Sequence, residues 1–175
     1  ESWIYVAPRS ALAAVKYELY KWDSKITPGT MVTYEGLKKI VAEWDGDAPK
    51  GIIFDESSRI KTPTAQRSRA AKYVADAMRE EHEGSYIIEM SGTPAPKSPL
   101  DWWHQCEVAC PGFLKESTIH QMKARMAIVE ERMNATGGTF PMLITWLDNE
   151  AKCIECGMPK DHINHGILNH TFEPS

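Results

Sequence analysis

The chain lacks any run of about 18 or more apolar residues, the length that a membrane-spanning helix requires. It also lacks a basic leader with a cleavage-like site at its start. Positive charge is not in excess, because the formal net charge is −4 at pH 7 and the pI is near 5.9. Its four cysteines do not make the dense pattern of a disulfide scaffold. These absences predict a soluble intracellular protein with no membrane partner.

What is present fits one globular domain with a small appendage. The chain has 175 residues, of which 42% are hydrophobic and 25% charged, and this is enough to bury a core. An apolar run begins at Trp3 with no initiator methionine before it. We therefore expect the chain to be a segment of a larger protein.

Short apolar runs alternate with longer stretches of helical periodicity. Strands are predicted at 3–7, 31–34, 51–54, 85–90 and 140–146, and helices at 10–22, 35–44, 63–83, 99–108 and 115–134. This alternation predicts an α/β fold with a parallel sheet flanked by helices, in which ligands gather at the carboxyl ends of the strands. Ser10 is the expected cap of the first helix.

In two of these helices the residue pattern favours a structural role in core packing over a catalytic or ligand-binding role. The spacing of Cys106 and Cys110, one turn apart, favours two buried thiols. The helix predicted at 115–134 has an apolar stripe for which core packing is a sufficient explanation. The stripe consists of Ile119, Met122, Met126, Val129 and Met133.

Two carboxylates, Asp55 and Glu56, follow the apolar run 51–54 directly. At the edge of a sheet, one carboxylate can hold Mg²⁺ while the other orients or deprotonates an attacking water. An ordinary acidic turn explains the pair alone equally well. The longer string 52–62 (IIFDESSRIKT), continued by 66–70 (QRSRA), is more specific.

This string resembles motif II of superfamily-two helicases, and the Swi/Snf-type translocases most closely. The resemblance implies a RecA-like lobe of the P-loop NTPase type, in which Asp55 binds Mg-ATP and Glu56 activates water. Ser58 stands where many relatives have a histidine or aspartate that couples the nucleotide site to the next motif, so the coupling would rest on a hydroxyl. Lys61, Arg67 and Arg69 either approach phosphates or form a solvated helix face.

Other strings match further motifs of the same family in the same order. The string 91–94 (SGTP) resembles motif III, which implies a coupling role for Ser91, Gly92 and Thr93, although a generic strand-end turn looks similar. The strings 99–103 (PLDWW) and 111–114 (PGFL) resemble the segment that follows it. The strings 6–12 (VAPRSAL) and 32–35 (VTYE) resemble motifs Ia and Ib. Their implied contacts with the nucleic-acid backbone come from Pro8, Arg9, Ser10, Thr33 and Tyr34.

The resemblance implies an ATP hydrolase that moves along nucleic acid, double-stranded DNA being the preferred partner, with ATP and Mg²⁺ as cofactors. We expect an intracellular protein, either cytoplasmic or nucleoid-associated, and the compact lobe suggests a phage or bacterial origin. No G-x-x-x-x-G-K-[ST] string occurs, so the loop that cradles the ATP phosphates is missing and this fragment alone should be inactive. A second RecA-like lobe is expected beyond Ser175. Residues 1–134 are the expected partial lobe, and 135–175 a linker hairpin with a zinc-knuckle-like module.

The last segment has the spacing of a metal site. Two thiolates and two imidazoles, from Cys153, Cys156, His165 and His170, would bind a structural Zn²⁺, with His162 as the alternative ligand. Free thiols beside surface histidines are the other explanation. If the zinc module is the functional part, the protein is instead a DNA- or protein-binding module on an inactive helicase-like lobe.

Overall fold

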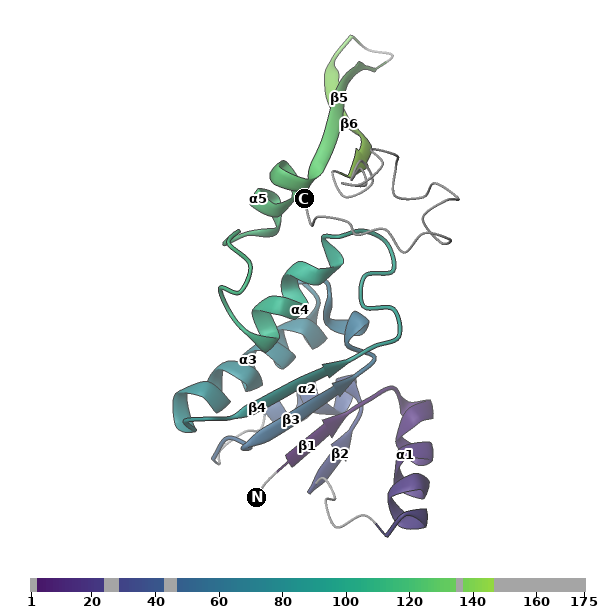
Figure 1. Ribbon diagram of the computed structural model, residues 1–175, viewed down its shortest axis with the longest axis vertical. Helices are drawn as coiled ribbons and strands as arrows, with labels where there is room; N and C mark the ends of the chain where they lie inside the picture. Colours follow the sequence, from purple (N-terminus) through teal and green to yellow (C-terminus); the bar gives the residue numbers. More distant parts are fainter. Residues whose placement is uncertain (1–2, 24–28, 43–46, 135–136, 147–175) are drawn as a thin grey trace, which may run out of the picture. The chain divides into compact units, whose positions relative to one another are not determined.

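Four short strands form a parallel sheet in the order β2-β1-β3-β4 (Figure 1). The computed structural model describes residues 3–23, 29–42, 47–134 and 137–146, and the chain divides into two compact units, Glu1–Ile119 (unit 1) and His120–Ser175 (unit 2). The elements of unit 1 are β1 (Trp3–Val6), α1 (Arg9–Lys21), β2 (Thr30–Val32), α2 (Tyr34–Ala42), β3 (Gly51–Asp55), the short 3-10 helix η1 (Ser57–Ile60), α3 (Gln66–Glu81), β4 (Tyr86–Met90) and α4 (Asp101–Ala109).

The strands alternate with helices as the sequence predicts, and their register aligns their carboxyl ends. Val6 on β1 pairs with Val32 on β2 and with Phe54 on β3, and Phe54 pairs with Glu89 on β4. Since all four strands are parallel, the loops that follow them leave from the same edge of the sheet.

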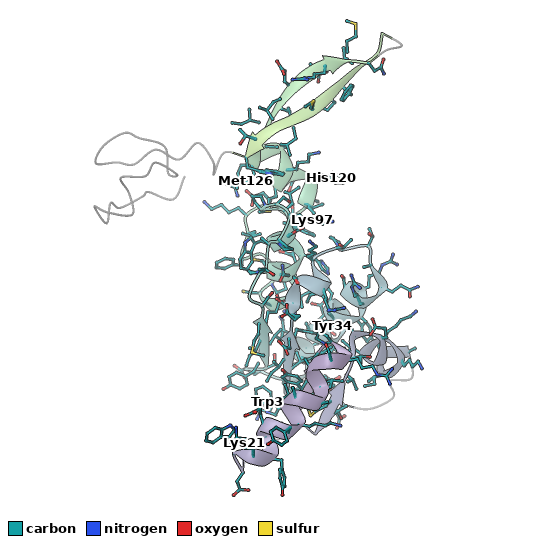
Figure 2. The ribbon with its side chains drawn as sticks, turned by 90° about the vertical axis from the view of Figure 1, so that its right-hand side faces the viewer. Trp3, Lys21, Tyr34, Lys97, His120 and Met126 are labelled. Atoms are coloured by element: carbon teal, nitrogen blue, oxygen red, sulfur yellow. The ribbon has the colours of Figure 1, made fainter. Side chains whose placement is uncertain are left out.

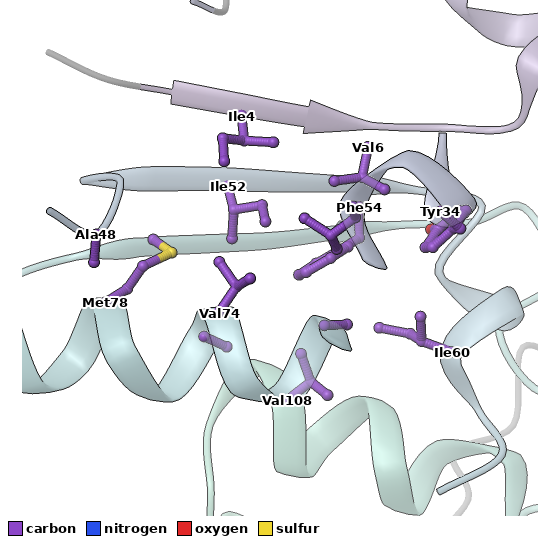
Figure 3. Packing of buried hydrophobic residues seen from close by; sticks show 13 residues of the cluster. Ile4, Val6, Tyr34, Ala48, Ile52, Phe54, Ile60, Val74, Met78 and Val108 are labelled. Carbon is purple, nitrogen blue, oxygen red and sulfur yellow. The ribbon is translucent and has the colours of Figure 1, made fainter. Parts of the chain in front are cut away.

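One face of the sheet builds the core. Ile4, Val6, Ile52 and Phe54 alternate along β1 and β3 and point to the same side, as successive side chains of a strand must. Figure 3 shows them facing the helices that cover this side. The helical side chains of the cluster are Tyr34, Leu37, Ile60, Ala71, Val74, Ala75, Met78 and Val108. Burial of each large apolar side chain stabilises the fold by about 1.5–3 kcal/mol.

On the other face, Trp3 reaches across Gly51 to stack on Tyr86, with ring centroids 5.8 Å apart. A Cβ at Gly51 would lie 2.5 Å from the Trp3 ring, so this close approach requires glycine. The rest of this face is more open, since Ile88 and Met90 are 39% and 41% exposed. The helix α1, which runs beside β2 in Figure 1, has no buried residue.

The described part of unit 2 consists of α5 (Ile119–Met126), which starts at the boundary of the units, and an antiparallel hairpin of β5 (Ala127–Met133) and β6 (Thr139–Trp146). The prediction of one helix over 115–134 is wrong in its second half. Asn134 begins the turn, with its carbonyl accepting from the Gly137 amide at 3.1 Å, and Gly137 has φ 85°. Pairing with β6 outcompetes helix formation because β-branched Ile128 and Val129 suit a strand.

The apolar stripe assigned to that helix is therefore divided between two elements. Met122 is buried on α5, whereas Val129 and Met133 lie on β5 and are 49% and 73% exposed. Side chains stand out from both faces of the hairpin (Figure 2). The two compact units divide after Ile119, the first residue of α5, and the domain boundary after residue 134 stays a prediction from the sequence.

Two smaller predictions are corrected in unit 1. The helix α1 begins at Arg9 with Pro8 as its N-cap, because the Pro8 carbonyl accepts from the Ala11 and Leu12 amides at 2.9 and 3.3 Å, so Ser10 lies inside the helix and is not the cap. Cys106 is half-buried on α4, but Cys110 is exposed beyond the end of that helix. The two thiols are therefore not both buried. None of the described helices is long and apolar enough to cross a membrane.

Candidate functional site

The residues singled out by the sequence lie in loops at one edge of the sheet. Arg9 follows β1, Thr33 follows β2, Glu56 follows β3 and Ser91 follows β4. The aligned carboxyl ends of the strands bring these four loops to a common edge, which is where open parallel sheets bind ligands. We call this the carboxyl edge.

The Asp55 carboxylate, at the end of β3, is held by a tyrosine from the neighbouring strand. The Tyr5 hydroxyl donates to Asp55 Oδ2 at 2.8 Å, and the Tyr34 hydroxyl donates to the Asp55 carbonyl at 2.7 Å. Burial, followed by the bond to Asp55, raises the pKa of Tyr5, so its proton stays on the phenol. These two bonds fix both the side chain and the main chain of Asp55.

Glu56 adopts an unusual backbone conformation. Its φ of 57° and ψ of 54° lie in the left-handed region, which costs a residue with a Cβ about 1–2 kcal/mol. This conformation turns the chain from β3 into η1 and leaves the Glu56 side chain exposed. The Ser91 hydroxyl makes a long contact of 3.5 Å with Glu56 Oε2. The acidic pair and the turn after β4 therefore meet at Glu56.

A buried link between the same two loops starts at Ser57. The Ser57 hydroxyl, 2% exposed, donates to Gln105 Oε1 at 2.7 Å. The Gln105 amide nitrogen in turn donates to the Pro94 carbonyl at 2.8 Å and to the Asp101 carbonyl at 2.7 Å. In the part of the chain that the structure describes, no hydrogen bond involves the Ser58 side chain. The bonded link thus runs through Ser57 and not through Ser58.

Gln105 is a residue of this link that the sequence did not predict. It lies on α4 and is 1% exposed, so its amide needs internal partners. The only sequence signal is an uncharged polar residue on the buried side of a short helix, between His104 and Val108. That signal does not reveal which loops the amide joins.

A little-exposed ion pair anchors the start of the same helix. Lys61 Nζ lies 2.8 Å from Asp101 Oδ2, with the two side chains 18% and 14% exposed. Asp101 Oδ2 also accepts from the Lys97 main-chain amide at 3.0 Å. Lys61 is therefore engaged with α4.

Glu89, on β4, is a second group that was not predicted from the sequence. It faces the helical side of the sheet, and its Oε1 atom is buried without a hydrogen-bond partner. Burial raises the pKa of Glu89 to about 8. Burial also raises the pKa of Cys106, with the charge of Glu89 adding to the effect. A carboxyl at an inward position of an apolar strand is the sequence signal that could have identified it.

The loops expected to contact nucleic acid present different groups. Arg9 and Ser10 are exposed after β1. The Thr33 hydroxyl accepts from the Gly36 amide at 3.0 Å and so caps α2. Tyr34 is 1% exposed and its ring stacks near Phe54, so the residue is buried in this structure and its contact with nucleic acid stays a prediction from the sequence.

The predicted zinc ligands Cys153, Cys156, His165 and His170, and the alternative His162, lie outside the described residues. Within the described residues, no group of three or more histidine, cysteine, aspartate or glutamate side chains could hold a metal ion. The zinc site stays a prediction from the sequence.

The four-stranded parallel sheet, with helices beside it and loops gathered at its carboxyl edge, defines the RecA-like α/β class, and the predicted fold class is confirmed. Neither a known family model nor a curated protein matches the chain. Among solved structures, the chain is similar to the SWI2/SNF2 ATPase core of Sulfolobus solfataricus in complex with double-stranded DNA. The TM-score is 0.52 and the sequence identity 24%, over 71% of this chain and 28% of that chain. The chain thus spans less than a third of the length of that protein.

Proposed function

We propose that unit 1 is part of the first RecA-like lobe of an ATP-driven translocase that moves along double-stranded DNA. One observation carries this proposal: Asp55 ends β3 at the carboxyl edge, and Glu56 follows it in a strained conformation, beside the turn that begins at Ser91. Strained backbone clusters at functional sites, where the surrounding structure maintains it. The similarity to a SWI2/SNF2 ATPase core supports the same proposal.

The donor groups at this edge fit Mg²⁺ and a nucleotide. Asp55 is half-buried, and Tyr5 occupies one of its carboxylate oxygens, which leaves the other as a hard oxygen ligand of the kind that Mg²⁺ prefers. When bound, Mg-ATP supplies the phosphoryl group and the metal charge that neutralises its oxygens. Asp55 would hold the cation, and the Tyr5 bond would orient Asp55 for that task.

Glu56 is exposed at the same edge and can accept a proton from a water molecule. Its left-handed backbone directs the side chain away from the core, and the Ser91 contact ties its position to the turn after β4. In the proposed motor, Ser91, Gly92 and Thr93 couple the hydrolysis site to the nucleic-acid loops. Arg9, Ser10 and the main chain near Thr33 would contact the nucleic-acid backbone.

The hydrolysis role is tested by Glu56→Gln in the full-length protein that contains this chain. We expect ATP turnover to fall by about 10²-fold or more while ATP binding persists, because only the proton acceptor is removed. Glu83→Gln, the same change at an exposed residue beyond the end of α3, is the matched control and should keep full turnover. Retained turnover in Glu56→Gln would remove Glu56 from this role.

The motor as a whole depends on a phosphate-cradling loop that these 175 residues do not contain. The coding sequence that precedes Glu1 should encode a Gly-Lys-Thr or Gly-Lys-Ser loop within a few tens of residues. If the gene encodes no such loop anywhere, the proposal of an ATP-driven motor fails.

A further inference from the structure

A cavity of about 520 Å³ lies between the first turns of α2 and α3. Its walls include Lys38 and Lys39 from α2 and Arg67 from α3, all three exposed. Lys38 Nζ donates to the Gln66 side-chain oxygen across the cavity, which joins the two helices. We call this cavity the α2–α3 groove.

The groove is positively charged within an acidic chain. Its lining contains three cations, Lys38, Lys39 and Arg67, and a single carboxylate, Glu35, although the formal net charge of the chain is −4. By contrast, Lys61 and Lys72 of unit 1 each pair with a carboxylate, Asp101 at 2.8 Å and Asp76 at 2.6 Å.

The partners of the groove cations are neutral. Lys38 bonds an amide oxygen, and Arg67 Nε donates to the Arg59 carbonyl at 2.5 Å. In the part of the chain that the structure describes, no carboxylate forms an ion pair with Lys38, Lys39 or Arg67. Arg67 is held in place through one nitrogen, so its other N–H groups stay available for an anion. The three cations of the lining outnumber its one carboxylate, Glu35, so the groove keeps a net positive charge.

The position of the groove favours nucleic acid over other anions. Its wall begins at Tyr34, the residue after Thr33, so it continues directly from the loop after β2 at the carboxyl edge. Lysine supplies point charges and arginine a planar fork, and both are the usual contacts to phosphate oxygens. The described lining offers no exposed aromatic or large apolar side chain of the kind that anchors a peptide.

We propose that the α2–α3 groove binds the phosphates of a nucleic-acid backbone, and so extends the contact surface of this lobe beyond the loops after β1 and β2. This inference rests on the proposed function, because it assigns a further surface to the same partner. Lys38, Lys39 and Arg67 carry the contact, and it does not read the base sequence.

The test is equilibrium binding of a fluorescent duplex of about 20 base pairs to the 175-residue chain over a range of salt concentrations. Each lost phosphate contact lowers the magnitude of the slope of log K against log salt by about 0.9 and weakens binding about five- to tenfold near 0.1 M salt. We expect this change for Lys39→Ala and for Arg67→Ala, and about twice the change in slope for Lys38→Ala combined with Lys39→Ala. Lys115→Ala, which removes the same charge from an exposed residue outside the groove, should bind as the wild type does.

Circular dichroism of each variant checks that the helices are intact. Duplex binding with an unchanged salt slope in the groove variants would overturn the groove inference and leave the proposed function standing. Absence of duplex binding by the wild type at low salt would overturn the groove and the nucleic-acid part of the proposed function, but not the Glu56→Gln result. If a poly-glutamate peptide binds more tightly than the duplex and responds to the same substitutions, the groove is a protein-docking site and the inference is wrong.

Discussion

Gln105 joins the segment after β3 to the turn after β4, and replacing it allows the strength of this link to be measured. Gln105→Met keeps the length of the side chain but removes one acceptor and two donated bonds. The Ser57 hydroxyl, 2% exposed, is then left without its acceptor, and the Pro94 carbonyl without this donor.

The expected cost follows from these contacts. Leaving a buried polar group unpaired costs about 1–3 kcal/mol, and each net hydrogen bond contributes about 0.5–1.5 kcal/mol. The lost bond to the Asp101 carbonyl adds little to this cost, because that carbonyl also accepts a backbone hydrogen bond within α4. We therefore expect Gln105→Met to lower the free energy of unfolding by about 2–4 kcal/mol, and Ser57→Ala to lower it by about 1–3 kcal/mol.

The two substitutions should not add, because the double variant removes both partners of one bond. Urea unfolding of the wild type, both single variants and the double variant, followed by helical circular dichroism, gives the coupling energy of this cycle. We expect the double variant to be about 1–2 kcal/mol more stable than the sum of the single effects predicts. Free energies that add within about 0.5 kcal/mol would refute the link.

Three further predictions concern stability, pH and packing. Burial raises the pKa of Glu89 to about 8 in the fold, against 4.5 for the ordinary carboxyl, so between these pH values the folded state holds a proton that the unfolded chain has released. The free energy of unfolding of the wild type should therefore fall with rising pH, by up to about 1.4 kcal/mol per pH unit. In urea unfolding between pH 5 and 8, the stability of Glu89→Gln should rise relative to that of the wild type. An unchanged difference across that range would contradict this. Gly51→Ala should lower the free energy of unfolding by about 1–3 kcal/mol, because its Cβ would lie 2.5 Å from the Trp3 ring. At Gly92 an added Cβ meets nothing within 4 Å, so the stability of Gly92→Ala should stay within about 0.5 kcal/mol of the wild type. The third expectation is that Asp101→Asn destabilises unit 1 by more than Glu18→Gln does. The first change leaves Lys61, at 18% exposure, without its carboxylate, whereas the ion pair of Glu18 with Lys21 is half-exposed and contributes little stability. Equal unfolding midpoints of the two variants would count against this expectation.

The sheet was predictable because its signals are local. Apolar runs such as 51–54 are short, and polar or glycine-containing stretches separate them from the helices. Parallel topology then dictates that Glu56 and Ser91 lie at one edge, whatever the details of packing. The hairpin was not predictable in this way, since Val129 and Met133 satisfy a helical period as well as a strand, and pairing with β6 decided between them.

The candidate site shows the same division. The acidic pair could be assigned from its position after a strand, but the left-handed backbone of Glu56 carries no residue signal, because glycine or asparagine usually marks that conformation. The sequence predicts a coupling role for Ser58, whereas the hydrogen bond to the distant helix α4 is made by the Ser57 hydroxyl with Gln105. Contacts between residues 48 positions apart are set by the tertiary fold, and local pattern does not contain them.

The two sheets within the described residues differ in how far apart along the sequence their paired residues lie, and this separation sets how fast each sheet can form. In the parallel sheet Trp3 pairs with Gly51, and every such pairing must close a loop that contains a helix. In the hairpin Met133 pairs with Thr139, so only a short loop closes. Hairpins form in about 1–10 μs, whereas non-local pairings take milliseconds or longer. The strands of the parallel sheet precede the hairpin in the chain, so they leave the ribosome first during synthesis. The slower sheet can therefore begin to assemble before the hairpin has been made.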